Sequence, residues 1–421
     1  MQVYKLNNGI RVASEKLPYL KSISVGIWVG AGCFAEDEKN NGISHFIEHM
    51  LFKGTKKRSA AEIAGCIDAL GGVLNAFTAK ECTCFYVNIL SEHYGVAIDL
   101  LCDMLINSRF DKDDIAREAG VVCEEIAMVE DTPDDLANEN LARAYYGSHP
   151  LGQTILGSAD NVRSFSADMI KEYMNRVYVP ENIVVSVAGN YDEKAVIDML
   201  NEKLTVKGFD SVEKCPPLKK EKGDIIFVQK DIEQVNLCLG FPGMGQTAEN
   251  YFAATMAGNI LGGGMSSRLF QRVREKNGMT YAIYSYLAAN VNSGMLTVYA
   301  GMNQNQAADV LDLIADEIEA MRRSGITDKE YTEAKEQLKG GFVLGLESAG
   351  ARMNRNGKVL LLNGRVLTQE EVLREISDVS KEEINKTVAG MLDFSHLSAA
   401  SVGRCSRGDA LYKKLTALKN C

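Results

Sequence analysis

The sequence predicts an α+β fold in which two homologous sandwich domains each consist of an antiparallel-rich sheet covered by helices. Two observations support this prediction. Helical patterns alternate with short β-rich segments, including hairpins, along most of the chain. The second half also repeats the first: Ser166 opens a predicted helix and Ile183 starts the next strand, and Ser380 and Leu397 repeat this arrangement 214 residues later.

The domain bounds follow from the repeat and from a change in composition. Residues 207–223 are rich in lysine, glycine and proline, which is typical of a linker. A chain of 421 residues also has room for two domains. We therefore expect domains at 1–210 and 223–421, joined by a linker at 211–222.

Local patterns predict the elements of the first copy. Asn7-Asn8-Gly9 lies between two short apolar segments and predicts a hairpin. Residues 22–29 alternate apolar side chains with small residues and Trp28, which predicts a half-buried strand. The remaining patterns predict helices at 60–70, 92–107, 111–129, 166–176 and 192–204, and strands at 74–78, 83–89 and 183–188.

Residues 43–52 predict a helix with two distinct faces. His45 and His49 stand one turn apart, so both imidazoles can bind one metal ion. Glu48 lies one turn from His45, close enough to act on a water at that ion. The order His-x-x-Glu-His is expected of an inverzincin peptidase. The opposite face is apolar and is formed by Ile43, Phe46, Ile47, Met50 and Leu51.

A solvated polar face on a buried helix is the alternative interpretation of these residues. Histidine is scarce, with five in 421 residues, and two of the five stand in this short motif, which favours the metal site. The 214-residue offset places Asn259, Gly262 and Gly263 where the motif would be repeated. The second copy is therefore expected to lack a metal site.

A third metal ligand is expected on the predicted helix at 111–129. A zinc peptidase needs three protein ligands and one open position, and a carboxylate is the usual partner of two histidines. Glu118 and Glu125 are seven residues apart and share one face of this helix. Glu124 and Glu125 project about 100° apart, so only one of them can point at the site. Spacing alone leaves several acidic residues possible.

The chain resembles the pitrilysin/insulinase family of zinc peptidases, especially the short bacterial members related to mitochondrial processing peptidase. The resemblance rests on the His-x-x-Glu-His motif and covers essentially the whole chain, and it implies the duplicated processing-peptidase-like fold. It implies that the third ligand is Glu125, which stands 76 residues after His49. It also implies one zinc ion per chain, and it places Glu118 near the metal as a second glutamate.

The resemblance also implies a substrate-binding edge strand in the segment Gly71–Thr78, with Asn75, Ala76 and Phe77 as the binding residues. An exposed sheet edge can bind an extended peptide as an additional strand, through backbone hydrogen bonds that depend little on sequence. A plain core strand is the alternative for this segment.

The second half contains a glycine run at 262–264 followed by Arg274 and Tyr281. The run lacks the Gly-Lys-Ser/Thr ending of a phosphate-binding loop. The segment instead resembles a family element in which the arginine and the tyrosine reach the metal site of the first half. An arginine there can hold a substrate carbonyl, and a phenol can donate to the oxyanion of the tetrahedral intermediate. A surface arginine and a core tyrosine are the alternative.

The combined prediction is a zinc metalloendopeptidase that hydrolyses internal bonds of extended or unfolded peptides. Glu48 accepts the proton of the attacking water and later delivers it to the leaving amine. Two other functions are possible: a non-catalytic assembly subunit of the processing-peptidase type, and a zinc enzyme that acts on small molecules. The intact ligand set argues against the first, and the edge strand argues weakly against the second.

The composition restricts the partners and the compartment. The net charge of −10 disfavours nucleic acid and anionic membranes. No apolar run approaches the roughly 20 residues of a membrane helix, and the N-terminus lacks the features of a targeting segment. Ten cysteines without framework spacing indicate reduced thiols and a cytoplasmic protein. Family members of this length commonly pair, so a homodimer is expected.

Overall fold

The computed structural model describes residues 1–208, 215–216, 218 and 223–420. Of the predicted linker at 211–222, only Cys215, Pro216 and Leu218 lie among these residues. The chain forms two compact units, and each unit takes one segment from the opposite half of the sequence. Unit 1 comprises Met1–Ile126, Gln153–Cys215 and Val343–Thr368, and unit 2 comprises Ala127–Gly152, Pro216–Phe342 and Gln369–Cys421.

Unit 1 is built on a six-stranded mixed sheet with the order β1-β2-β6-β3-β5-β4. Only β2 and β6 pair in parallel, so the sheet is rich in antiparallel pairs, as predicted. The predicted hairpin joins β1 to β2, with Gly9 at a positive φ of 98°. The strands are β1 (Gln2–Lys5), β2 (Arg11–Lys16), β3 (Ser22–Val29), β4 (Val73–Thr78), β5 (Thr83–Leu90) and β6 (Ile183–Gly189).

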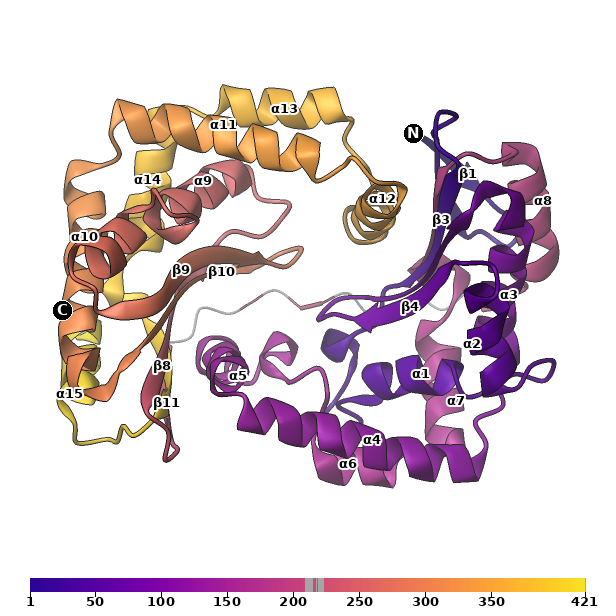
Figure 1. The fold of residues 1–421 in the computed structure, drawn as a ribbon, viewed down its shortest axis with the longest axis horizontal. Helices are drawn as coiled ribbons and strands as arrows, with labels where there is room; N and C mark the ends of the chain where they lie inside the picture. Colours follow the sequence, from indigo (N-terminus) through magenta and orange to yellow (C-terminus); the bar gives the residue numbers. More distant parts are fainter. Residues whose placement is uncertain (209–214, 217, 219–222, 421) are drawn as a thin grey trace. The chain divides into compact units, whose positions relative to one another are not determined.

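Helices cover one face of this sheet and enclose the main hydrophobic core of unit 1. Figure 1 shows α2, α3 and α8 on that side of the strands. Apolar residues of the strands and of the inner helix faces meet there, because alternate strand residues and every third or fourth helix residue point inward. The helices of this part are α1 (Ile43–Leu51), α2 (Ala60–Asp68), α3 (Tyr94–Asn107), α4 (Lys112–Asp131), α6 (Ala159–Ser164), α7 (Ala167–Val177) and α8 (Glu193–Lys203).

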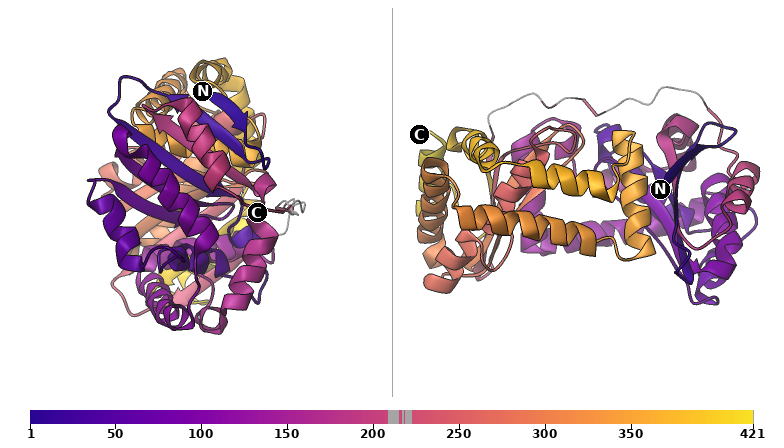
Figure 2. Two further views of the ribbon diagram at one scale, coloured as in Figure 1. Left: turned by 90° about the vertical axis from the view of Figure 1, so that its right-hand side faces the viewer. Right: turned by 90° about the horizontal axis from the view of Figure 1, so that it is seen from above.

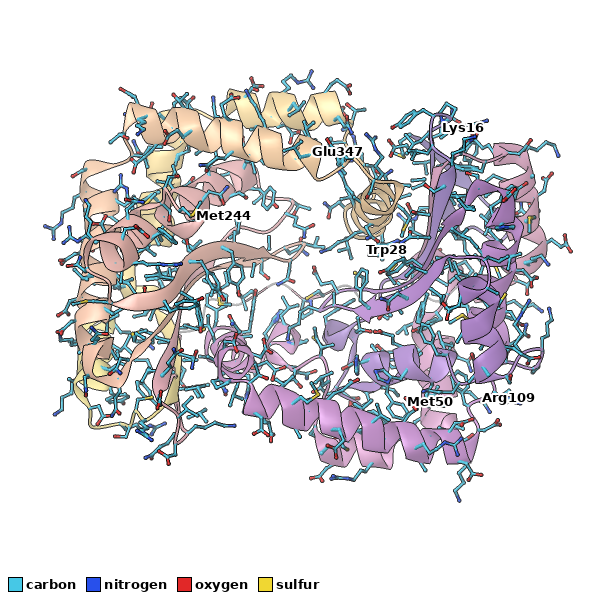
Figure 3. The ribbon with its side chains drawn as sticks, viewed as in Figure 1. Lys16, Trp28, Met50, Arg109, Met244 and Glu347 are labelled. Atoms are coloured by element: carbon cyan, nitrogen blue, oxygen red, sulfur yellow. The ribbon has the colours of Figure 1, made fainter. Side chains whose placement is uncertain are left out.

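The other face of the same sheet is covered by α12 (Ala349–Asn363), which comes from the second half of the sequence (Figure 2). Two glycines permit the close approach. A Cβ at Gly26 of β3 would lie 2.4 Å from Sδ of Met353, and a Cβ at Gly357 would lie 2.2 Å from Nε1 of Trp28. Trp28, labelled in Figure 3, therefore fills the space between β3 and α12 and is 1% exposed.

Burial on both faces corrects one expectation from the sequence. Strand β3 was expected to be half buried, but every residue of it after Ser22 is buried. The small residues that alternate with its apolar ones, Ser24 and Gly26, face α12 rather than solvent, since they lie on the same side of the strand as Trp28.

Unit 2 repeats this architecture. Its five-stranded sheet has the order β7-β11-β8-β10-β9, which matches β2-β6-β3-β5-β4 of unit 1, and β7 and β11 form its single parallel pair. This agreement confirms the predicted duplication. The strands are β7 (Ile225–Gln229), β8 (Gln234–Gly243), β9 (Thr280–Ala289), β10 (Gly294–Asn303) and β11 (Ser398–Gly403).

Helices of unit 2 cover its sheet in the same manner. One face packs against α5 (Pro133–Tyr146), which comes from the first half of the sequence and contacts β8 and β11. Helices α5 and α12 are thus exchanged between the two halves. The remaining helices are α9 (Tyr251–Gly262), α10 (Ala307–Ser324), α11 (Asp328–Leu344), α13 (Gln369–Asp378), α14 (Lys381–Met391) and α15 (Ala410–Lys419).

The exchange bears on the predicted domain bounds. Cutting the chain at 211–222 separates the two sheets. It also separates α5 from the unit 2 sheet and α12 from the unit 1 sheet, which these helices cover. The bounds 1–210 and 223–421 remain a prediction about the repeat in the sequence. The compact units of the fold are discontinuous.

Candidate metal centre

Helix α1 presents the two predicted histidines on one side. Ile43, Phe46 and Met50 are at most 1% exposed on its inner face, so the side that carries His45 and His49 faces away from the core. Met50 is labelled in Figure 3. The two imidazole rings lie 4.7 Å apart, centroid to centroid. The amphipathic pattern read from the sequence is therefore confirmed at this helix.

Helix α4 brings an acidic side chain to these two histidines as the third member of the group. Oε2 of Glu125 lies 3.7 Å from Nε2 of His45 and 3.6 Å from Nε2 of His49. One candidate ligand atom from each of the three residues lies within 4.8 Å of the others. Among the described residues this is the only group of three or more His, Cys, Asp or Glu side chains with such geometry. Its neighbour Glu124 is exposed and does not belong to it.

The chemistry of this donor set fits zinc. Two imidazole nitrogens and one carboxylate are the protein ligands of many catalytic zinc sites, and they leave a fourth position open. Burial, reinforced by the neighbouring His49, lowers the pKa of His45 to about 4. The His45 imidazole is therefore neutral near pH 7, with a lone pair available for a metal ion.

Glu118 contacts His49 from the side opposite the shared metal position. Its Oε2 lies 3.2 Å from Nδ1 of His49, while its Oε1 lies 2.7 Å from Nζ of Lys53. A carboxylate at Nδ1 fixes the ring orientation and the tautomer that leaves Nε2 free to bind metal. The family resemblance implies a second glutamate near the metal, and Glu118 lies next to His49.

Glu48 lies on the same face of α1 as the two histidines and accepts a side-chain hydrogen bond from one of the described residues. The hydroxyl of Thr78, in β4, donates to Oε2 of Glu48 over 2.5 Å. Burial raises the pKa of Glu48, and the Thr78 hydrogen bond partly opposes that shift. A carboxylate whose pKa is raised toward neutrality is suited to accept a proton and release it again.

A residue that the sequence analysis missed holds the start of α1. Glu36 is 6% exposed and accepts hydrogen bonds from the backbone N–H groups of Gly42 and Ser44, each at 2.8 Å. A negative charge at a helix N-terminus satisfies free N–H groups and interacts favourably with the helix dipole. Gly42, at φ 100°, offers no side chain to cap the helix. A glycine in that position was the signal that could have directed attention to a carboxylate nearby.

The predicted binding strand β4 lies at one edge of the unit 1 sheet and, among the described residues, pairs only with β5. Oδ1 of Asn75 accepts a hydrogen bond from the backbone N–H of Ala76. The ring of Phe77 packs edge-on against Trp28, 5.5 Å away, so its side chain lies on the α12 face of the sheet. Thr78 ends the strand beside Glu48, which connects the free edge to the metal centre.

Arg274 and Tyr281 lie close together in unit 2. Arg274 belongs to a π-helical turn at Phe270–Lys276, and Tyr281 lies near the start of β9. The guanidinium carbon lies 5.6 Å from the centroid of the Tyr281 ring and 4.8 Å from that of Phe270. Tyr281 is 81% exposed, so it is not a core tyrosine.

The duplicated sandwich, with an inverted His-x-x-Glu-His helix and a glutamate from a neighbouring helix, defines the inverzincin class of zinc peptidases. Comparison of the sequence with known families gives the same result. Residues 11–159 match the insulinase family, peptidase family M16, and residues 164–338 match the peptidase M16 inactive domain. The chain belongs to this family of zinc peptidases.

Relatives extend the similarity over most of the chain. The chain is 42% identical over 386 residues to the zinc protease YmxG of Bacillus subtilis, covering 91% of this chain and 93% of that protein. It is 39% identical over 395 residues to the zinc protease SCO5738 of Streptomyces coelicolor, covering 92% and 86% of the two chains.

Solved structures show the same fold at lower sequence identity. The peptidase M16 inactive domain from Pseudomonas fluorescens aligns with a TM-score of 0.90 at 21% identity, covering 96% of this chain and 98% of that one. A protease from Helicobacter pylori aligns with a TM-score of 0.89 at 21% identity, covering 96% of this chain and 99% of that one.

In the part of this chain that the structure describes, no helix is both long and apolar enough to cross a membrane.

Proposed function

We propose that the chain is a zinc metalloendopeptidase that hydrolyses internal bonds of extended or unfolded peptides, with one zinc ion per chain. The observation that carries this proposal is the convergence of His45, His49 and Glu125, with Glu48 next to them on the same helix face. When bound, a zinc ion supplies Lewis acidity to the attacking water and to the scissile carbonyl.

The residues of the chain perform the remaining steps. Glu48 accepts the proton of the attacking water and delivers it to the leaving amine, and its raised pKa supports both transfers. Glu118 keeps His49 oriented. Proton transfer by a positioned side chain contributes roughly 100- to 10,000-fold to the rate of such reactions.

Strand β4 binds the substrate backbone. Its unpaired side can accept an extended peptide as a further strand, and Asn75, Ala76 and Phe77 form the middle of that edge. Such binding requires an unfolded segment, because a strand within a folded domain has its backbone groups already paired. The free edge ends at Thr78, whose hydrogen bond to Glu48 supports a substrate path that leads to the general base.

Arg274 and Tyr281 are proposed to act on the substrate, as the family resemblance implies. Tyr281 donates a hydrogen bond to the oxyanion, and Arg274 positions the peptide. The exposure of Tyr281 and its contact with the guanidinium of Arg274 support these roles, since both side chains are available to a substrate and mutually oriented.

A non-catalytic assembly subunit is the rival function, and the intact centre disfavours it. A subunit without chemistry has no requirement for three ligands and a general base. We further propose a homodimer in the cytoplasm. Nucleic acid and membranes are not expected as partners of a chain with a net charge of −10.

Metal analysis combined with a peptidase assay tests the proposed function. The purified full-length chain should contain zinc and cleave an internally quenched unstructured peptide, and a chelator should abolish cleavage. Glu48→Gln should retain zinc and lose activity, whereas Glu124→Gln, the matched exposed control, should retain both. A zinc-loaded wild-type protein that cleaves none of a diverse peptide library would refute the proposal.

A further inference from the structure

Lys53 forms the outer end of a chain of contacts that leads to the metal centre. It directly follows Phe52, the C-cap residue of α1, and its ammonium group lies 2.7 Å from Oε1 of Glu118. The other oxygen of Glu118 lies 3.2 Å from Nδ1 of His49, and Nε2 of that ring faces Glu125 at 3.6 Å. The ammonium group is therefore connected to the metal ligand through one carboxylate.

Because the Glu118 side chain is buried, its carboxylate requires a cation nearby, and Lys53 provides one. The Glu118 side chain is 7% exposed, while that of Lys53 is 34% exposed. A buried carboxylate is costly unless a cation and hydrogen-bond donors compensate it. Among the described residues, Lys53 is the one lysine or arginine within ion-pair distance of Glu118. Without Lys53, the carboxylate would lower its free energy by turning toward water, and this would move it away from His49.

The two histidine ligands are supported unequally, which increases the importance of this contact. Nδ1 of His45 is buried and has no hydrogen-bond partner among the described residues. His49 alone is held by a carboxylate at Nδ1. If Glu118 moves, His49 loses its orientation, and His45 has no comparable hydrogen bond among the described residues that would keep its own ring in place.

We propose that Lys53 is a positioning residue of the metal centre, which holds Glu118 against His49 and so raises the affinity for zinc. This inference rests on the proposed function only in taking the centre to bind zinc. It goes further by assigning a role to a lysine that lies outside the His-x-x-Glu-His motif and whose ion pair, among the described residues, is with Glu118 rather than with one of the three ligands.

Lys53→Met is the test, because methionine keeps much of the apolar stem and removes the charge. Changes in the partners that orient metal ligands typically cost about 10- to 100-fold in metal affinity. We expect the zinc Kd of Lys53→Met, measured by competition with a fluorescent chelator, to rise by a factor in that range. Lys53→Arg should restore most of the affinity. Lys57→Met removes an exposed lysine of the same segment and should leave the Kd unchanged.

A double-mutant cycle shows whether Lys53 acts through Glu118. Glu118→Gln should itself weaken zinc binding, and adding Lys53→Met to it should cost little more. The visible absorption spectrum of the cobalt-substituted protein should change in both single variants, because a reoriented His49 alters the ligand geometry. A purely structural lysine would instead lower the melting temperature and leave the spectrum and the Kd as they are.

The outcomes separate this inference from the proposed function. Wild-type affinity in Lys53→Met would overturn the inference, and so would full additivity with Glu118→Gln. A protein that binds zinc but cleaves no peptide would refute the proposed peptidase activity. The zinc Kd of Lys53→Met would still decide whether Lys53 positions the metal centre. A wild-type chain that binds no zinc would refute both.

Discussion

Replacing Gly357 with alanine should weaken the contact between α12 and the unit 1 sheet. The added Cβ would lie 2.2 Å from Nε1 and 2.4 Å from Cδ1 of Trp28. Trp28 is enclosed, at 1% exposure, so neither the indole nor the helix can move without disturbing the packing of the other. Overpacking of this kind typically costs about 1–3 kcal/mol.

A second glycine in the same helix provides the matched control. A Cβ at Gly350 would lie no closer than 3.5 Å to any neighbour, with Oδ1 of Asn88 at 3.5 Å and Oγ of Ser24 at 3.8 Å, which are ordinary contacts. Replacing a helical glycine with alanine stabilises a helix by roughly 0.5–1 kcal/mol where space permits. Gly350→Ala should therefore leave the protein as stable as the wild type or slightly more so. Gly357→Ala should be less stable than Gly350→Ala by about 1–3 kcal/mol.

Urea unfolding followed by tryptophan fluorescence measures this difference directly. The chain has a single tryptophan, so the emission reports the environment of Trp28 alone. Gly357→Ala should lower the unfolding midpoint and shift the native emission, because the indole no longer fits its site. Equal midpoints and identical emission spectra for the two alanine variants would show that α12 does not pack on Trp28 as described.

The remaining predictions concern the site. Glu48→Gln should bind zinc with wild-type affinity and lose roughly 100- to 10,000-fold in kcat; wild-type turnover would show that Glu48 is not the base. Glu125→Gln should lose zinc affinity in a chelator competition while Glu124→Gln does not, and the reverse result would move the third ligand by one residue. Tyr281→Phe should lower kcat by about 100-fold with little change in KM, as expected for an oxyanion donor. Arg274→Ala should mainly raise KM, and an effect on kcat alone would contradict its role in binding peptide.

Much of the fold and of the site could be predicted because both leave periodic signals. A helix buried on one side must repeat its apolar residues with the helical period, so α1 and the placement of His45 and His49 were readable from the sequence. Spacing could not choose among the acidic residues for the third ligand, and Glu125 was selected through the family resemblance. The structure agrees with that choice.

Two of the residues that were missed, Lys53 and Thr78, act through contacts between distant parts of the chain. Lys53 contacts Glu118 and Thr78 contacts Glu48 through tertiary packing that no local pattern records. Glu36 lies near its partner Gly42 in the sequence, and there the glycine was the only signal. The exchange of α5 and α12 was missed for a related reason. An amphipathic pattern shows that a helix face is buried, but it does not identify the sheet that buries it. The expectation that β3 is half buried was wrong for the same reason, since its covering helix lies more than 300 residues further along the sequence.

The exchange of helices also determines the order in which the protein can mature during its synthesis. Six strands and the whole metal centre have left the ribosome well before residue 349, where α12 begins. Until Asn363 has emerged, no helix packs on the side of the unit 1 sheet that carries Trp28. Apolar surface that is exposed on a nascent chain promotes misassembly. The zinc-binding half is thus translated first but completed late, and a truncated chain of residues 1–210 would present that uncovered side permanently.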